Sequence, residues 1–144
     1  MKVLIGRFKN GGQKVSVKID TYDTWSMDCT LAHIVVPMLE QLKKTKHGIP
    51  NNMFTEEYED IMRNNHYWVE PENGALHKKI KQLHKEASKR WNDTISKMIW
   101  SFKEARSNYP GEEKFYKANR PFNKEGYDEY HKRLKEGLRL FGEY

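Results

Sequence analysis

The stretch ALHKKIKQLHKEASKRWNDTISKMIWSFKEAR, residues 75 to 106, decides the fold because it predicts one helix long enough to organise the rest of the chain. Its apolar side chains recur every three or four residues, with no Gly or Pro between them. These positions are Leu76, Ile80, Leu83, Ala87, Trp91, Ile95, Met98 and Phe102. The sequence NYPGEE then ends the helix. We therefore expect residues 75 to 106 to form the structural axis of the protein.

Residues 2 to 20 predict a β-hairpin. The β-branched runs KVLIGRF and KVSVKID flank KNGGQ, and Asn-Gly between such runs is a strong signal for a two-residue turn. Two short antiparallel strands are therefore expected before the first helix.

Apolar residues at helical spacing predict a helix over residues 24 to 46. They are Met27, Leu31, Ile34, Val35, Met38 and Leu42. Asp23 or Thr24 can serve as the N-cap, and the sequence GIP stops the helix. Pro37 removes one backbone hydrogen bond and crowds the preceding turn, so we expect a kink or a break there.

The remaining segments complete an α+β fold that is mainly α. Residues 47 to 74 contain Pro50 and Pro71, so they are expected to be irregular and to form a lid, with one short helix around TEEYEDIMRNN. Tyr and Leu residues at helical spacing predict a C-terminal helix over residues 124 to 142. The length suffices for one modest core, so residues 1 to 144 are expected to form a single domain.

The charge is positive overall and uneven along the chain. There are 26 Lys and Arg against 20 Asp and Glu, a net charge of +6, which favours an anionic partner. Residues 51 to 74 form an acidic bridge between two basic flanks. A single cysteine excludes an intrachain disulfide, no apolar run is long enough to span a bilayer, and MKVLIGRFKNGGQ is not typical of a signal peptide. We expect a soluble protein of a reducing cytoplasm.

Acidic and histidine side chains offer two weak metal sites. Asp20, Asp23 and Asp28 could supply oxygen ligands to a divalent cation, but Asp23 serves equally well as an N-cap and Asp28 complements the helix dipole. His77 and His84 could share one helix face, yet a zinc site needs a third ligand. No metal and no cofactor are therefore expected.

Catalytic patterns are equally weak. Cys29 and His33 lie four residues apart in the predicted helix, so a pair of thiolate and base is geometrically feasible. A semi-buried structural cysteine is the more common case. The NGG sequence joins two strands and does not open a helix, so it is not a phosphate-binding loop. We expect a protein that is not an enzyme.

Signals for ligand binding are stronger. Aromatic rings at the predicted start of the first long helix can stack on bases beside its free backbone N–H groups. The lysine cluster KKTKHG is either a phosphate patch or an ordinary helix C-terminus, and a solvated face explains most lysines around SKRW. The candidate ligand contacts are Tyr22, Trp25, Ser26, Asp28, Lys43, Lys46, His47, Arg90 and Trp91. The rings would contact bases, the basic side chains would contact phosphates or base edges, and Ser26 and Asp28 would provide polar specificity, Asp28 by accepting from guanine.

The segments IDTYDTWSMDCTLA, PMLEQLKKTKHG and the later RW with MIWSF resemble a widespread family of small proteins of large tailed bacteriophages. That family is similar to the phage anti-CBASS sponges, which form tetramers and sequester the cyclic dinucleotide messenger of a bacterial immune system, typically 3′3′-cGAMP. The resemblance implies an immune-evasion protein that acts in the host bacterial cytoplasm. It also implies a homo-oligomer, tetrameric by analogy, that binds its messenger without cleaving it.

Three other functions stay open. The basic flanks would suit a nucleic-acid-binding phage accessory protein, which a steep salt dependence on long DNA or RNA would indicate. The aromatic residues would suit an inhibitor that binds a host protein through interface hot spots, which capture from host lysate would indicate. A hydrolase of signalling nucleotides would release cleavage products.

Overall fold

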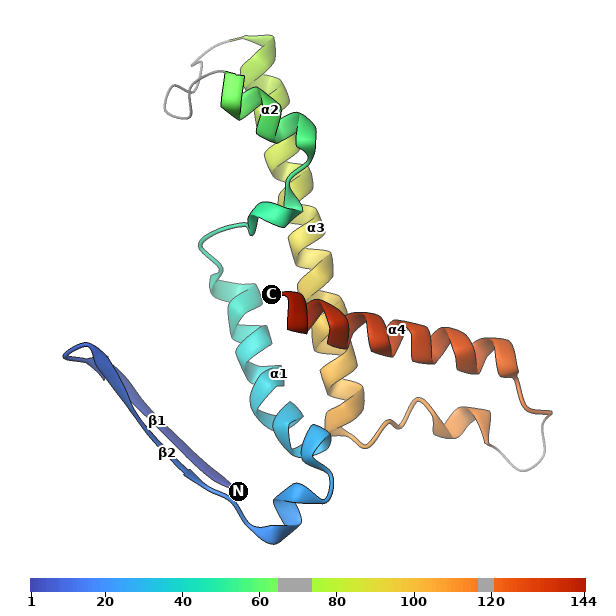
Figure 1. The fold of residues 1–144 in the computed structure, drawn as a ribbon. Helices are drawn as coiled ribbons and strands as arrows, with labels where there is room; N and C mark the ends of the chain where they lie inside the picture. Colours follow the sequence, from blue (N-terminus) through green and yellow to red (C-terminus); the bar gives the residue numbers. More distant parts are fainter. Residues whose placement is uncertain (65–73, 117–120) are drawn as a thin grey trace.

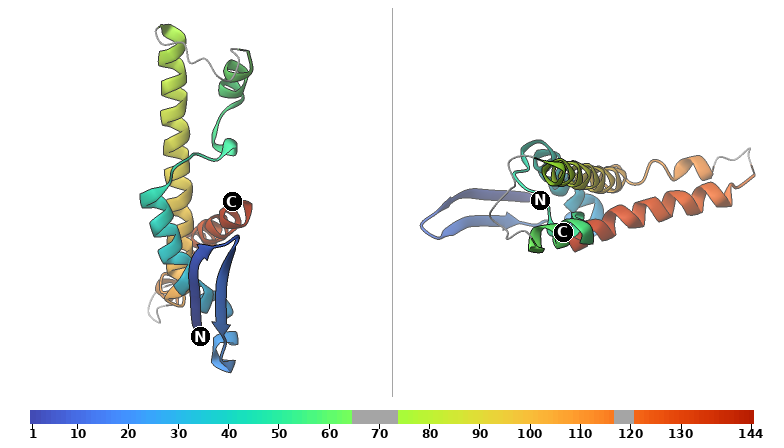
Figure 2. Two further views of the ribbon diagram at one scale, coloured as in Figure 1. Left: turned by 90° about the vertical axis from the view of Figure 1, so that its left-hand side faces the viewer. Right: turned by 90° about the horizontal axis from the view of Figure 1, so that it is seen from above.

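Helix α3, Ala75–Arg106, is the axis of the protein and spans the residues predicted for it (Figure 1). The computed structural model describes residues 1–64, 74–116 and 121–144. Two long helices pack against α3: α1, Met27–Thr45, and α4, Lys124–Glu143. With the N-terminal hairpin, they give the expected α+β architecture, mainly α. Seen from above, the hairpin and α4 extend in opposite directions from α3 (Figure 2).

The short helix predicted around TEEYEDIMRNN is confirmed as α2, Glu56–Asn64. It docks on the N-terminal part of α3, where Lys79 Nζ lies 2.9 Å from Glu57 Oε1. Three single-turn 3-10 helices join the longer elements: η1, Thr21–Thr24; η2, Asn51–Met53; and η3, Glu113–Phe115. Part of the predicted lid, residues 65–73, lies outside the described residues, and the lid role stays a prediction.

The core forms where α1 and α4 meet the middle of α3. Leu39 of α1 packs with Trp91, Ile95 and Met98 of α3, all of them buried. The periodic positions of α3 explain this directly, because residues three and four apart share one side of a helix. Leu76 and Phe102, at the two ends of the predicted series, are half-buried.

The side of α1 that is buried against α3 is not the side centred on the apolar residues that predicted the helix. The buried residues are Ala32, Val36 and Leu39, whereas Met27, Leu31 and Met38 are exposed. The small side chains of Ala32 and Val36 let the two backbones approach closely, which larger side chains would prevent. Helix α1 therefore has two apolar sides, and the described residues cover only one of them.

The predicted start of this helix is corrected, and of the two alternatives expected at Pro37, a kink or a break, the break is wrong. Residues Thr21–Thr24 form η1, with Asp20 as its N-cap and Asp23 completing the capping box. Neither Asp23 nor Thr24 therefore caps α1, which begins at Met27 after the N-cap residue Ser26. Helix α1 continues through Pro37 as one element. Proline removes a single backbone bond, and the packing of Val36 and Leu39 on α3 holds the turns on both sides.

Helix α4 crosses α3 at a glycine. A Cβ at Gly137 would lie 2.1 Å from Ser101 Oγ and 2.5 Å from the Lys97 carbonyl oxygen. Both Gly137 and Ser101 are buried. The missing side chain therefore permits the close crossing of α3 and α4.

The predicted hairpin is confirmed as β1, Lys2–Lys9, paired antiparallel with β2, Gly12–Lys18. At its turn Asn10 has φ 51° and Gly11 φ 78°, the two positive values of a type I′ turn. Within the described residues, the two strands contact no other helix or strand. In the same part of the chain, no helix is both long and apolar enough to cross a membrane.

Candidate functional site

The predicted aromatic contacts lie together at the N-terminal end of α1. The rings of Tyr22 and Trp25 are 5.0 Å apart, and the two residues are 73% and 75% exposed. They occupy η1 and the residue after it. Both rings therefore face solvent and are free to contact a partner.

Ser26 and Asp28 follow these rings in the chain, and the Asp28 side chain is engaged in a tertiary hydrogen bond. Ser26 is the N-cap residue of α1 and makes no side-chain capping bond. The Tyr109 hydroxyl donates a hydrogen bond to Asp28 Oδ2, and this bond holds the pKa of Asp28 below its usual value. Asp28 thus joins the start of α1 to the turn after α3.

The predicted basic contacts lie at the opposite end of α1. Lys43 Nζ donates to Ser96 Oγ at 2.8 Å, and Lys46 Nζ donates to Asn92 Oδ1 at 2.6 Å. His47 is exposed just beyond the helix. Since α1 has 19 residues, a rise of about 1.5 Å per residue gives the helix a length of roughly 27 Å. This length keeps the cations far from Tyr22 and Trp25.

Arg90 and Trp91 are held within the fold. Arg90 Nε donates to the Met53 carbonyl at 2.9 Å, while its Nη2 is buried without a partner in the described part of the chain. Trp91 is 2% exposed and packs in the core, with the Tyr144 ring 4.9 Å away. Its position is a correction to the expected base contact, because a ring enclosed by the core has no free face.

The nine candidate residues therefore do not line one shared hollow in a single chain. Two groups lie at opposite ends of α1, and a third belongs to the core. The periodicity of α3 already indicated that Trp91 lies on the same side as Ile95 and Met98.

A different pocket does combine rings and cations. It lies between the C-terminal half of α3, η3 and the first half of α4, and its volume is about 530 Å³, within the usual range for ligand sites. We call it the aromatic pocket. Its lining residues are Trp100, Lys114, Phe115, Pro121, Asn123, Gly126, Glu129, Tyr130 and Arg133.

The cations of the aromatic pocket lie over its rings. The guanidinium carbon of Arg133 is 3.9 Å from the centre of the Trp100 ring. Lys114 Nζ is 4.9 Å from the centre of Phe115 and 5.7 Å from that of Tyr130. Cation–π attraction holds both positive charges at the pocket wall.

A buried anchor fixes the Tyr130 ring. Its hydroxyl donates to Glu104 Oε2 at 2.7 Å, and the Gly111 N–H donates to the same oxygen at 3.1 Å. Burial, followed by this hydrogen bond, raises the pKa of Tyr130 far above its usual value. The phenol therefore stays neutral and keeps its proton to donate to Glu104.

The sequence contains a signal for this pocket that the candidate list did not include. Five rings fall between residues 115 and 130, in the stretch that includes both FY and NRPFN. They are Phe115, Tyr116, Phe122, Tyr127 and Tyr130. Only the fold brings them to Trp100, whose ring lies 5.7 Å from that of Tyr130.

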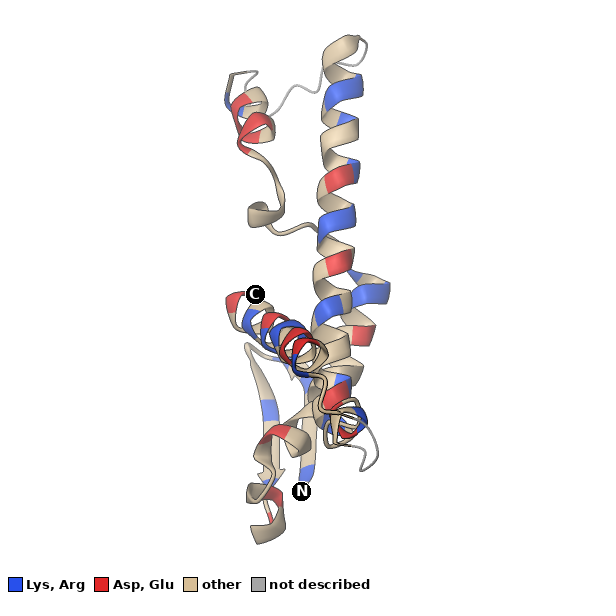
Figure 3. Ribbon diagram, turned by 90° about the vertical axis from the view of Figure 1, so that its right-hand side faces the viewer, with Lys and Arg blue, Asp and Glu red and all other residues tan. Residues whose placement is uncertain are grey.

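A second basic surface runs along α3. Lys78, Lys81, Lys85 and Lys89 are exposed, and at 3.6 residues per turn they share about a quarter of the helix circumference. We call these four residues the lysine face. No Asp or Glu of α3 lies in that sector, and none of the four forms an ion pair with a described residue. Figure 3 shows Lys and Arg recurring along α3.

The weak catalytic and metal patterns gain little from the structure. Burial and the neighbouring Asp28 charge raise the pKa of the Cys29 thiol, which disfavours a thiolate. The Asp23 carboxylate accepts from the Asp20 N–H at 2.7 Å and pairs with the Met1 amine. Among the described residues, no group of three acidic, His or Cys side chains is arranged to hold a metal.

Comparison of the chain with protein-family models, curated proteins and solved structures finds no match.

Proposed function

We propose that this chain is a non-catalytic protein that binds a cyclic dinucleotide of the 3′3′-cGAMP class in the aromatic pocket and so withdraws a messenger from CBASS signalling. The observation that carries the proposal is the Arg133 guanidinium stacked on Trp100, in a pocket that also presents Lys114. Flat rings beside fixed cations match bases beside phosphates. The motif resemblance to small phage proteins supplies the messenger class.

The half-buried rings of Trp100 and Phe115 would supply surfaces for the bases, and the buried ring of Tyr130 would support them. The centre of the Tyr130 ring lies 5.7 Å from that of Trp100 and 5.9 Å from that of Phe115. Stacking contributes about 1 to 3 kcal/mol per base in single-stranded recognition. The Arg133 guanidinium adds a planar surface of its own, since bases also stack on guanidinium planes.

The charged groups would orient the ligand. Lys114 and Arg133 attract phosphates, and Glu129 in the same lining repels them. A carboxylate can accept from guanine N1–H and N2–H, which is the role expected of Asp28 from the sequence. In this pocket Glu129 is the group placed to take that role.

Binding is tested by calorimetry and thermal shift with 3′3′-cGAMP on the full chain. Ligand that binds only the folded state raises its melting temperature. Arg133→Gln is expected to weaken binding about tenfold to a hundredfold, because a hydrogen bond to a charged group contributes roughly 1.5–3 kcal/mol. Recovery of intact ligand after heating would support storage over cleavage.

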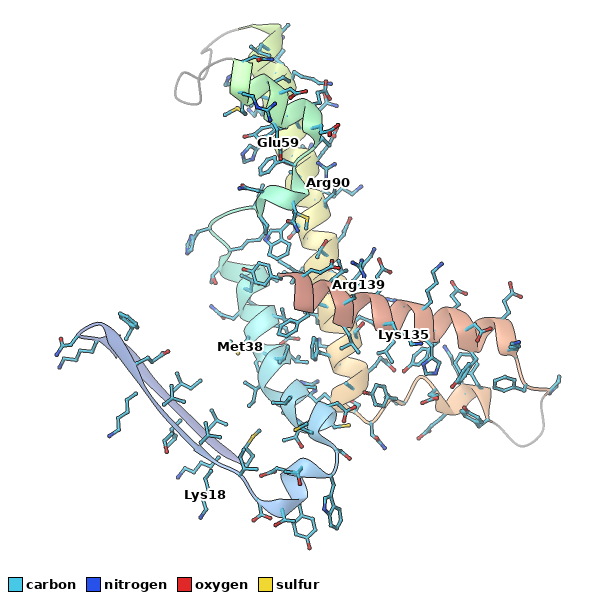
Figure 4. The ribbon with its side chains drawn as sticks, in the orientation of Figure 1. Lys18, Met38, Glu59, Arg90, Lys135 and Arg139 are labelled. Carbon is cyan, nitrogen blue, oxygen red and sulfur yellow. The ribbon has the colours of Figure 1, made fainter. Side chains whose placement is uncertain are left out.

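Lys135→Gln is the matched control. Lys135 is an exposed cation on α4 that does not line the pocket (Figure 4), so both variants lose one charge. Equal weakening in the two variants would attribute binding to overall charge. No thermal shift with any cyclic dinucleotide would refute the proposal.

A second candidate function is binding of single-stranded nucleic acid along the lysine face. Lys46 and Lys43 extend the lysine face. Their hydrogen bonds to Asn92 and Ser96 place them further along the same side of α3. An elongated row of charges suits a phosphate backbone. Affinity for an oligonucleotide should then fall steeply with salt, and Lys85→Gln with Lys89→Gln should flatten that slope while leaving cyclic dinucleotide binding unchanged.

A further inference from the structure

The β-hairpin has one apolar face. Val3 pairs with Val17 and Ile5 with Val15, so these four side chains share one side of the ribbon. An irregularity between Ile5 and Phe8 places Phe8 opposite Gln13. Because Gln13 lies two residues from Val15, this shift returns Phe8 to the same side.

The opposite face of the hairpin is cationic. Lys2 pairs with Lys18 and Lys9 with Gly12, while Leu4 pairs with Ser16. Figure 4 shows Lys18 on the side of the hairpin turned away from α1. Lysines on this face favour contact with water, so the apolar face is the one that needs a cover.

Nothing in the described chain covers the apolar face. Among the described residues, the strands contact no other helix or strand. Ile5, Phe8, Val15 and Val17 are all more than half exposed, whereas Val3 is half-buried. An isolated two-stranded hairpin is marginally stable in water at best. A second surface must therefore pack on it for the hairpin to be well ordered.

Helix α1 presents a matching surface. Its second apolar side exposes Met27, Leu31 and Met38, and Figure 4 shows Met38 on the side of α1 that faces the hairpin. No Asp, Glu, Lys or Arg lies between these positions on that side of the helix. Both surfaces are apolar and uncharged, and both lack a partner in the described residues.

We propose that a second copy of this chain covers these surfaces: the hairpin of each copy packs its apolar face on the exposed side of α1 of the other, in a two-fold dimer. An isologous arrangement covers all four surfaces at once. A standard stable interface buries about 800 Å² per partner. The dimer would draw on seven large apolar side chains in each copy that are 48% to 73% exposed: Ile5, Phe8, Val15, Val17, Met27, Leu31 and Met38.

The connection between the hairpin and α1 favours exchange over closure within one chain. The capping box of Asp20 and Asp23 fixes η1 directly after β2, and the hairpin diverges from α1 beyond it (Figure 1). With η1 in this conformation, neither strand contacts α1 of the same chain. A second copy reaches both surfaces with the turn intact.

Sedimentation of the full chain tests the dimer with a pair of neighbouring substitutions. Leu4 and Ile5 are each 55% exposed but lie on opposite faces of β1. Ile5→Glu would place a charge in the interface and is expected to raise the dimer dissociation constant at least about a hundredfold. Leu4→Glu is expected to leave it unchanged.

Cross-linking between tagged and untagged copies identifies the contact. In a Cys29→Ser background, Val17→Cys on one copy and Leu31→Cys on the other should be joined by a short thiol cross-linker. A linked product of two different copies supports the exchange. A monomeric wild-type chain, equal effects of Ile5→Glu and Leu4→Glu, or linkage only within a single doubly substituted copy would each overturn the proposal.

Discussion

The Tyr109 hydroxyl ties the first turn of α1 to the loop that leaves α3, through its bond to Asp28. Asn108 and Tyr109 reach this position with φ values of 58° and 56°, in the left-handed region that few non-glycine residues adopt. The folded state lowers the pKa of Asp28 from 3.8, first through this bond. The stabilisation is therefore complete above that value and is lost as the pH falls through the lowered pKa.

Tyr109→Phe should reduce the free energy of unfolding by about 1 kcal/mol at neutral pH, because a charged hydrogen bond at an exposed site contributes less than a buried one. The difference from wild type should shrink as the pH falls below 3.8. Urea unfolding at several pH values measures it. Tyr22→Phe is the control, since Tyr22 makes no such side-chain bond within the described chain and its loss should be small at every pH. A Tyr109→Phe effect that is independent of pH would contradict this account.

At the scale of secondary structure, local signals predicted the elements and failed to predict how they pack. The Asn-Gly turn and the uninterrupted period of α3 depend on nearby residues only, and both elements are confirmed. Helix α1 carries two apolar sides, so its spacing could not show which side meets α3. The choice depends on the surface of α3, which lies far away in sequence.

The residues of the aromatic pocket could not be predicted from the sequence for a related reason. Trp100, Phe115 and Arg133 come from α3, η3 and α4, and only their packing makes one pocket. Tyr22 and Lys46 flank the same helix, α1, in the sequence. The length of that helix separates them in space. Residue type indicated the chemistry of a nucleotide site, and tertiary structure decided which residues could share one.

The crossing of α3 and α4 gives a test at this scale. Gly137→Ala should destabilise the protein by about 1–3 kcal/mol, because its Cβ would overlap Ser101 Oγ and the Lys97 carbonyl. Gly142→Ala lies in the same helix with no atom within 4 Å of the new Cβ, and should be neutral or stabilising by up to about 1 kcal/mol. Thermal unfolding of both variants measures the difference. Similar melting temperatures for the two would mean that the helices cross with more space than this structure shows.

At the scale of the whole molecule, the three helices and the hairpin have different sources of stability. Helices α1, α3 and α4 share a core within one chain, whereas the hairpin would gain its cover only in the dimer proposed above. By mass action, association stabilises the part of the molecule that is buried in the dimer, so the stability of the hairpin should rise with protein concentration. The stability of α3 should not depend on protein concentration.

Hydrogen exchange separates these two parts of the molecule. Amides in β1 and β2 are expected to exchange more slowly as the protein is concentrated, while amides of α3 around Trp91 should show no change. Ile5→Glu should remove the concentration dependence in the strands, and Leu4→Glu should retain it, because only Ile5 lies on the apolar face. Strand protection that is equally strong in dilute and concentrated samples would show that the hairpin is stable without a second copy. In that case its apolar face would require another explanation, while the aromatic pocket on the far side of α3 would be unaffected.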